Sequence, residues 1–295
     1  MRKIRLIYNP ASGDTSFKQK LDYVLEVFQL QGLQVVPHRS LDNEDIRHVV
    51  RQMRNETYEG LAVAGGDGTI HEVINAMAEE QLQVPLGVIP AGTANDFAAH
   101  INMPREIEKI GALIAEGHYR AVDLGKANNR YFVNVASAGL LTDVSHTVDI
   151  NFKNVLGKLA YYLKGVEQLP NFRSIPFRIE SNEVNAEEEL FLFLVLNGSC
   201  AGGFSRIVPA YIDDGLLDVV AIRKCSITHL ITLMLKILRG EHLQDRRVLY
   251  FQTKEVLFSS YTPLTSDLDG EKGPQLPLHV RVCPGNLKIF CNQQN

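Results

Sequence analysis

The sequence predicts two domains, an N-terminal α/β domain built on a doubly wound parallel sheet and a C-terminal antiparallel β-sandwich. Three observations predict this fold class. The chain has 295 residues, longer than a single hydrophobic core usually grows. Strand and helix patterns alternate over roughly the first 120 residues. From Ala121 onward, most apolar patterns alternate instead with a period of two residues.

The domain boundary is placed near residue 125, where the pattern changes. The first domain then covers residues 1–125 and the sandwich covers residues 126–284, and we expect residues from about 285 to 295 to return to the first domain. No linker rich in Pro or Gly marks the boundary, so it depends on the change of pattern alone.

In the first domain, four short apolar runs predict buried parallel strands, each followed by a turn and a helical pattern. The runs are Ile4–Tyr8, Leu33–Pro37, Leu61–Ala64 and Leu86–Ile89. Asp42 stands before Ile46, Val49 and Val50, which recur at helical spacing. Asp is a favoured N-cap residue, so Asp42 is expected to cap that helix.

In the second domain, short alternating runs bounded by turn formers such as Asn128-Asn129 and Ser181-Asn182 predict antiparallel strands. The expected strands are Tyr131–Val135, Phe177–Ile179, Leu190–Leu196, Leu217–Ile222, Val248–Phe251, Val256–Phe258 and Leu278–Val282. Two stretches have helical spacing, Leu156–Leu169 and Ile227–Leu238. We expect this domain to be a sandwich with two helices added.

Composition and charge exclude several classes of protein. The formal net charge is -4 with both signs interspersed, so nothing indicates a nucleic-acid partner. The apolar run at the N-terminus is too short for a signal peptide, and no stretch approaches the ~20 apolar residues that cross a bilayer. We therefore expect a cytoplasmic protein without a transmembrane segment, which contacts membranes only peripherally.

Three turns carry the chemistry of the first domain. Because they follow predicted parallel strands, they should meet at the edge of the sheet where such folds bind ligands. Their members are Asn9, Pro10, Ala11, Ser12 and Gly13 in the first, Gly65, Gly66, Asp67, Gly68 and Thr69 in the second, and Pro90 to Asp96 in the third. Glycines let backbone amides approach a phosphate, and the helix that follows adds its positive end.

Individual side chains of these turns leave alternatives open. Asp67 cannot itself bind phosphate, so it is expected to hold magnesium or its waters. Thr93 offers a hydroxyl either to phosphate or as the cap of the next helix, and Asp96 can accept from neighbouring amides. The sequence contains neither G-x-x-x-x-G-K-[ST] nor G-x-G-x-x-G, so the phosphate site must be of another type.

The three turns, in this order and spacing, resemble the diacylglycerol kinase catalytic domain, and the resemblance covers nearly the whole chain. The Gly-Gly-Asp-Gly element alone is shared with NAD kinases and phosphofructokinases, whereas the combination is specific. The resemblance implies that ATP binds in a cleft between the two domains, with magnesium as the second cofactor. It adds Ser40 to the nucleotide contacts, at a position where the family usually has threonine.

Two segments of the second domain also match this family. Tyr211–Leu216 resembles a magnesium site formed by the Asp214 side chain and the backbone carbonyls of Tyr211 and Leu216, although Asp-Asp-Gly is by itself an ordinary turn. Asp267–Glu271 resembles the segment that supplies the proton acceptor, which is Glu271 here, although it also reads as a solvated acidic loop.

The resemblance predicts an ATP-dependent lipid kinase that phosphorylates the hydroxyl of a lipid, with diacylglycerol as the leading substrate and phosphatidic acid as product. Glu271 takes the proton, and Asp67, Asp96 and Asp269 are the carboxylates expected to assist it. The alternatives are a kinase for NAD or another small molecule and a nucleotide sensor without activity. A homodimer is left open.

The helical stretch Ile227–Leu238 has a wide apolar stripe. It either packs against the sandwich or dips into a lipid interface. Packing is favoured, because the polar face of the helix carries few cations. The stripe consists of Ile227, Leu230, Ile231, Met234, Ile237 and Leu238, widened by Leu233 and Leu235.

Overall fold

The structure is a computed structural model that describes residues 1–12, 17–93, 95–139, 174–198 and 207–292. Gly13, Ala94 and the expected helix Leu156–Leu169 lie outside the described residues. The chain divides into two compact units. Unit 1 consists of Met1–Asp123 and Pro284–Asn295, and unit 2 of Leu124–Cys283.

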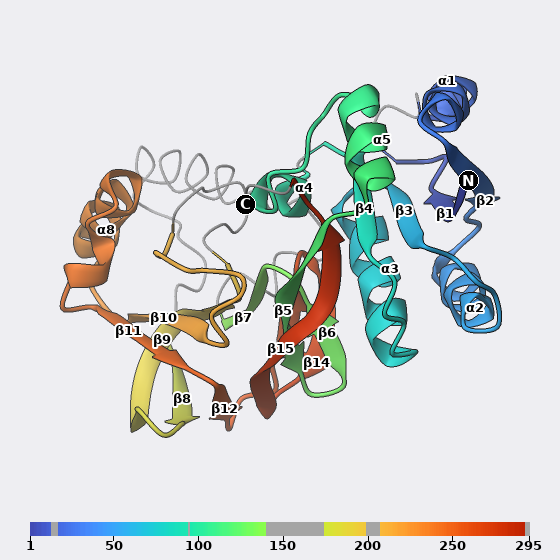
Figure 1. The fold of residues 1–295 in the computed structure, drawn as a ribbon. Coiled ribbons are helices and arrows are strands. Elements are labelled where there is room, and N and C mark those ends of the chain that lie inside the picture. Colours follow the sequence, from blue (N-terminus) through green and yellow to red (C-terminus); the bar gives the residue numbers. More distant parts are fainter. Residues whose placement is uncertain (13–16, 94, 140–173, 199–206, 293–295) are drawn as a thin grey trace. The chain divides into compact units, whose positions relative to one another are not determined.

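Unit 1 is built on a parallel sheet (Figure 1). Strand β1 (Arg2–Tyr8) lies between β2 (Leu33–Arg39) and β3 (Gly60–Gly65), β4 (Leu86–Pro90) pairs with the far side of β3, and the end of β15 (Leu278–Phe290) pairs with β4. Every residue of β3 is buried. A strand covered on both faces needs a continuous apolar run, which is how the sequence predicted it.

Helices cover the sheet of unit 1 in two pairs. Helix α1 (Phe17–Leu30) packs on α5 (Ile107–Glu116), and α2 (Asn43–Met53) packs on α3 (Asp67–Glu79). The short helix α4 (Asp96–His100) follows β4. The predicted cap of α2 is confirmed, because the Asp42 carboxylate accepts from the Asp45 amide at 2.9 Å. The doubly wound α/β architecture is therefore as the sequence predicted.

Unit 2 is antiparallel throughout its described strand pairs. The long strand β9 (Asn185–Leu196) pairs along its length with β7 (Val135–Gly139), β8 (Ile175–Glu180) and β10 (Leu217–Arg223). Strand β11 (Val248–Thr253) extends β10, and β12 (Glu255–Ser260) joins β8 to the start of β15. In the core, the Phe193 ring stacks on Phe258, with centroids 3.7 Å apart.

A second apolar cluster lies under helix α8 (Ile227–Arg239). The cluster joins Leu230 and Leu233 of the helix to Leu196, Val220 and other side chains of β9, β10 and β11. The helix begins where the Ser226 side chain accepts from the His229 amide and ends at Gly240, which has a φ of 73°. The predicted helix is confirmed, and so is its packing against the sandwich.

The expected strand Tyr131–Val135 is instead two strands, β6 (Arg130–Phe132) and β7. The interruption has a physical cause, because the amides of Val133, Asn134 and Val135 donate to the carboxylate of Asp269. Amides used in this way are not available to a continuous ladder. The sequence also missed the hairpin of β13 (Thr265–Leu268) and β14 (Glu271–Gln275).

Candidate active site

The turn after β1 is tied to the turn after β3 by three side chains. The Asn9 side-chain amide donates to Thr69 Oγ1 at 3.0 Å, and its Oδ1 accepts from the Ala11 amide at 2.9 Å. Ser12 Oγ accepts from the Gly66 amide at 3.2 Å and lies 3.5 Å from Thr69 Oγ1. Polar residues that looked like separate turn formers in the sequence therefore form one network.

The turns after β3 and β4 touch through their backbones. The Ala91 amide donates to the Gly65 carbonyl at 3.0 Å. A Cβ atom added to Gly92 would lie 2.5 Å from the Gly66 Cα, a separation that real Cβ atoms essentially never show. The two glycines therefore permit the contact, and the prediction that the three turns converge is confirmed within unit 1 for their described residues.

Asn95 shapes the third turn, and sequence reasoning did not select it. Its side chain accepts from the Gly92 amide and donates to the Gly92 carbonyl, both at 2.9 Å. Its φ is 54°, in the left-handed region that Asn tolerates better than most residues. The tolerance of Asn for a positive φ is the feature from which the sequence could have indicated a structural role for Asn95. Asn95 also occupies the N-cap position of α4, so the alternative in which Thr93 caps this helix is wrong.

Asp67 and Asp96 each begin a helix at this edge of the sheet. Asp67 is the first residue of α3, and its Oδ1 accepts from the Phe97 amide of α4 at 3.3 Å. Asp96 is the first residue of α4 and is half-buried. A carboxylate in the first turn of a helix is stabilised by the helix dipole. Thr93 is exposed, so its hydroxyl is accessible to a ligand.

Ser40 lies at the same edge of the sheet, directly after β2. Its side chain is buried, its Oγ donates to the Tyr8 carbonyl at 3.2 Å, and its amide donates to the same carbonyl at 2.9 Å. In the parallel register Tyr8 pairs with Arg39, so Ser40 stands beside Asn9. The hydroxyl oxygen keeps its capacity to accept a hydrogen bond.

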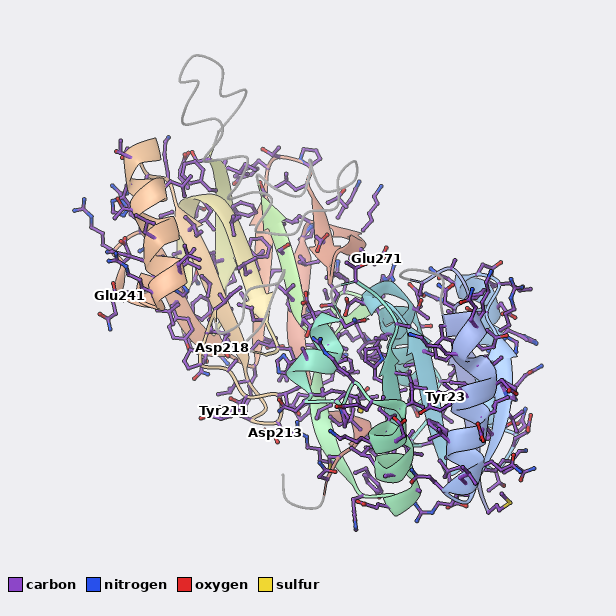
Figure 2. All side chains as sticks on the ribbon, turned by 90° about the horizontal axis from the view of Figure 1, so that it is seen from above. Tyr23, Tyr211, Asp213, Asp218, Glu241 and Glu271 are labelled. Carbon is purple, nitrogen blue, oxygen red and sulfur yellow. The ribbon has the colours of Figure 1, made fainter. Side chains whose placement is uncertain are left out.

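In unit 2, Asp269 anchors the β13–β14 hairpin. Its Oδ2 accepts from the Val133 amide at 2.7 Å, and its Oδ1 accepts from the amides of Asn134 at 2.9 Å and Val135 at 2.8 Å. Asp269 and Gly270 have φ angles of 54° and 90°, as a tight two-residue hairpin turn requires. Glu271 follows directly and is exposed (Figure 2). The two neighbouring carboxyl groups thus have different surroundings, one held by amides and the other open to solvent.

The segment Tyr211–Leu216 forms a turn before β10. Asp214 Oδ1 accepts from the Leu216 amide at 3.0 Å, and Gly215 has a φ of 72°. Tyr211 and Asp214 are exposed. This hydrogen bond is the one that the ordinary-turn alternative requires, and it engages only one of the two Asp214 oxygens.

Asp218 was missed by sequence reasoning because it reads as part of an apolar strand. It is buried in β10, near Tyr211 and Asp213 at one end of that strand (Figure 2). The Tyr250 hydroxyl donates to Asp218 Oδ1 at 2.6 Å. Burial and the charge of Asp214 raise the pKa of Asp218 despite hydrogen bonds from Tyr250 and Gln252. Burial and the Asp218 carboxylate raise the pKa of Tyr250.

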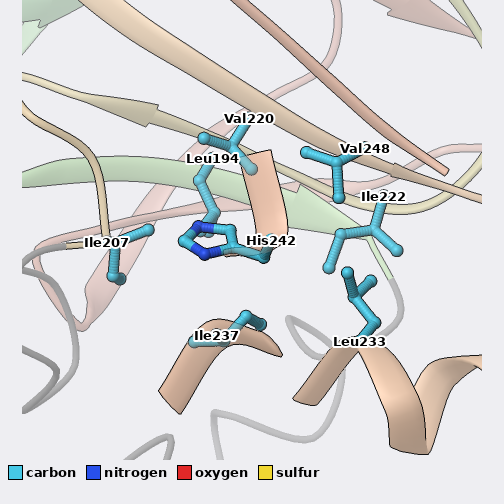
Figure 3. A pocket seen from close by; sticks show the side chains of 8 residues that line it. All are labelled: Leu194, Ile207, Val220, Ile222, Leu233, Ile237, His242 and Val248. Carbon is cyan, nitrogen blue, oxygen red and sulfur yellow. The ribbon is translucent and has the colours of Figure 1, made fainter. Parts of the chain in front are cut away.

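A small cavity of about 20 Å³ lies between α8 and the sheet of unit 2 (Figure 3). Its lining is apolar apart from His242, whose ring lies between side chains of the sheet and of α8. Burial lowers the pKa of His242, so the imidazole is neutral at pH 7. None of the predicted site residues lines this cavity.

Two properties of the described residues bear on the site. The described part of the chain contains no group of three or more His, Cys, Asp or Glu side chains placed to hold a metal ion. Among the same residues, no helix has the length and apolar character needed to cross a membrane. At the described residues, a bound magnesium ion would have fewer than three such side chains as ligands and would take its other oxygen ligands from carbonyls, water or the phosphates of a nucleotide.

Comparison with known proteins covers both units. Residues 3–127 match the family model described as the diacylglycerol kinase catalytic domain, and residues 134–291 match that of the YegS C-terminal NAD kinase beta sandwich-like domain. The protein named diacylglycerol kinase in Staphylococcus carnosus is 38% identical over 98% of this chain and 95% of its own length. The protein named diacylglycerol kinase in Bacillus subtilis is 37% identical over 94% of this chain and 92% of its own length.

A crystal structure described as a diacylglycerol kinase from Bacillus anthracis has the same fold. It covers 99% of this chain and 98% of its own, with a TM-score of 0.79 and 25% identity. The α/β unit with its three joined turns and the antiparallel sandwich are therefore the two domains of a kinase fold. The chain belongs to the diacylglycerol kinase family and is an ATP-dependent lipid kinase.

Proposed function

We propose that this protein transfers the γ-phosphate of ATP to the free hydroxyl of diacylglycerol, giving phosphatidic acid. The single observation that carries this proposal is the joining of the three glycine-rich turns by the Ser12–Gly66 hydrogen bond and the contact of Gly66 with Gly92. The names of the relatives support diacylglycerol as the acceptor. Membrane contact is peripheral, and the reaction takes place on the cytoplasmic side, where ATP is available.

The rim of unit 1 fits a nucleotide phosphate. Gly66 and Gly92 leave backbone at the surface with no side chain in front of it, and α3 directs its N-terminus to the same place. Asn9 and Ser12 supply polar groups beside Thr69, which we assign to the same binding edge. Ser40 and Thr93 are the further hydroxyls of this edge in the proposal.

Magnesium is the proposed second cofactor, and the carboxylates of Asp67 and Asp96 fit it chemically. Oxygen ligands are what this ion prefers, and it usually keeps several waters with one or two carboxylates. When bound, it neutralises charge that develops on the phosphates during transfer. Asp67 is held by the Phe97 amide through Oδ1, which orients the carboxylate at the start of α3.

In unit 2, we assign Glu271 as the group that takes the proton of the lipid hydroxyl, and Asp269 as the residue that positions it. Asp269 binds three amides and is therefore suited to fix the hairpin turn rather than to accept a proton. Glu271, two residues further along the chain and exposed, can reach an incoming hydroxyl. Asp214, with the carbonyls of Tyr211 and Leu216, is proposed to hold a second magnesium ion.

The acceptor is tested by incubating the purified protein with magnesium and γ-labelled ATP together with a panel of alcohols. The panel contains diacylglycerol, monoacylglycerol, a sphingoid base and NAD. We expect the label to enter organic solvent as phosphatidic acid, with diacylglycerol giving the highest kcat/KM. Label transferred to NAD and kept in the aqueous phase would overturn the proposal, and so would transfer to the sphingoid base alone.

A further inference from the structure

Among the described residues, helix α8 is held on unit 2 through the side that carries Leu230, Leu233 and Ile237. Leu230 and Leu233 are buried, and Ile237 packs partly against the same cluster. Asp245, itself buried, accepts from His229 Nε2 at 2.9 Å and from Lys236 Nζ at 2.7 Å. Apolar packing and a buried ion network therefore keep the helix in one orientation, which determines the face that it turns outward.

The outward face of α8 carries two leucines. Leu235 is 52% exposed and Leu238 is 63% exposed. They are three residues apart and so lie on the same face of the helix. Successive residues of a helix turn by about 100°, so Leu235 points nearly opposite to the fully buried Leu233. Exposed leucines adjacent on one helix face are a candidate contact surface rather than scattered apolar residues.

The sequence segment that contains α8 is predominantly positive. From Arg223 to Gly240 the sequence contains four Arg or Lys and no Asp or Glu. From Arg223 to Arg247 there are six Arg or Lys against Glu241 and Asp245, a net charge of +4 in a chain whose total is -4. Glu188 and Glu189 of β9 pair with Arg223 and Lys224. Arg239 and Arg246 are both exposed.

We propose that the outer face of α8, comprising Leu235, Leu238 and Arg239, docks on a membrane surface that contains anionic lipid. The proposal rests on the lipid-kinase function, because the acceptor lies in a bilayer that the enzyme must approach. Leucines inserted among acyl chains, with cations at the level of the headgroups, are the usual chemistry of an interfacial helix.

A second copy of this chain fits the same face less well. A symmetric dimer through α8 would bring the face against itself. That arrangement would place the positive segments of the two copies together, where like charges repel. An anionic bilayer meets both the leucines and the cations, so we assign the face to the membrane.

The test compares the full-length wild type with a Leu235→Gln/Leu238→Gln double variant in sedimentation with phosphatidylcholine–phosphatidylglycerol vesicles. Gln keeps helix propensity and both leucines are exposed, so the melting temperature should not change. We expect vesicle binding to fall by about tenfold or more. The matched control, Leu30→Gln/Leu41→Gln, replaces two exposed leucines of unit 1 and should bind as the wild type does.

The electrostatic part is tested with Arg239→Glu, which should lower binding to anionic vesicles by about tenfold and leave binding to pure phosphatidylcholine unchanged. Activity measurements distinguish a loss of membrane docking from a loss of catalysis. With a short-chain diacylglycerol dissolved as monomers, the leucine double variant should keep kcat/KM within about twofold, whereas its activity on vesicle-embedded diacylglycerol should fall with its binding.

Wild-type vesicle binding by the leucine double variant would overturn the proposal. So would a loss of self-association in ultracentrifugation with vesicle binding unchanged, because the face would then belong to a second copy. If the wild type phosphorylated no diacylglycerol in either form, the proposed substrate would fail, and the sedimentation result would still decide the docking surface.

Discussion

Gly92 lies so close to Gly66 that a Cβ atom on Gly92 would come within 2.5 Å of the Gly66 Cα, whereas a Cβ atom on Gly66 would lie 3.4 Å from the Gly92 Cα. The clash is with backbone, so it cannot be relieved by moving a side chain. This asymmetry makes the contact between the second and third turns testable by two alanine substitutions.

Gly92→Ala should destabilise the protein by about 1–3 kcal/mol, the usual cost of overpacking, and should weaken nucleotide binding. Gly66→Ala is the matched control for stability, since its φ of -86° suits alanine and its Cβ meets ordinary contact. Thermal unfolding and titration with a non-hydrolysable ATP analogue measure both effects. Equal melting temperatures for the two variants would contradict the close approach of the turns.

Asp67→Asn should keep the fold and lower kcat by several orders of magnitude. Asparagine retains an oxygen that can accept from the Phe97 amide, as Asp67 Oδ1 does, so the link between α3 and α4 survives. The negative charge is lost, and with it the proposed hold on magnesium. A folded Asp67→Asn protein with near-normal turnover would remove Asp67 from the mechanism. Asp96→Asn in the same assay shows whether the second carboxylate is equally required.

Asp269→Asn and Glu271→Gln should have different consequences. In Asp269→Asn an NH₂ group replaces one carboxylate oxygen. At least one of the three backbone amides that donate to Asp269 would then face another donor. Leaving a donor unpaired costs about 1–3 kcal/mol, so both stability and kcat should fall. Differential scanning calorimetry and steady-state kinetics on the same protein measure the pair of effects.

Glu271→Gln should leave the melting temperature unchanged, because the side chain is exposed, and should lower kcat by ~10²–10⁴-fold. Nucleotide affinity should not change. Glu187→Gln, which alters an exposed carboxylate on β9, is the control for the loss of one surface charge. If Glu271→Gln retained a turnover within about twofold of the wild type, Asp67 or Asp269 would have to be reconsidered as the base.

Magnesium should raise the melting temperature of the wild type, and Asp214→Ala should reduce that increase, because an ion bound to the native state alone stabilises it. Activity of the variant should fall as well. Asp213→Ala, the exposed neighbour, is the control and should keep the magnesium effect. A wild-type melting temperature indifferent to magnesium would favour the ordinary turn, in which Asp214 bonds only to the Leu216 amide.

Asp245→Asn should destabilise the protein by about 3 kcal/mol at neutral pH, because it breaks a buried ionic network. Burial opposes ionisation of Asp245, but Lys236, the Arg247 amide and His229 outweigh it and hold its pKa well below the usual range. A lowered folded pKa contributes stability above the unfolded value of about 4 and loses it at lower pH. The difference in unfolding free energy between wild type and variant should thus be constant from neutral pH to about 5 and shrink below about 4. A difference independent of pH would contradict the network.

Much of the fold could be predicted because its patterns are local. Apolar runs such as Leu61–Ala64 and the Asp42 cap need no knowledge of distant residues. The interruption of the strand at Val133 could not be predicted, since its cause is a carboxylate 136 residues away. The β13–β14 hairpin did carry a local signal, the Asp269-Gly270 pair, which is a favoured hairpin turn.

The candidate site could likewise be predicted only in part. Glycine-rich turns at strand ends are visible in the sequence, and so is their expected edge of the sheet. The partners are not visible, because Asn9 meets Thr69 and Ser12 meets Gly66 across more than fifty residues. Asp218 was missed for another reason, since a buried carboxylate that depends on Tyr250 has no pattern of its own.

The division of the chain also affects how the protein can fold as it is synthesised. Unit 1 is interrupted by the whole of unit 2, so its last strand segment, from Pro284 onward, is synthesised only after unit 2. Phe290 packs against Gly60, where an added Cβ would lie 2.7 Å from its ring, and Ile289 pairs with Leu86. The edge of β4 therefore stays open until unit 2 has been synthesised. An isolated fragment that ends at residue 127 would keep that edge exposed, with the hydrogen-bonding groups of an unpaired strand and a space in its core.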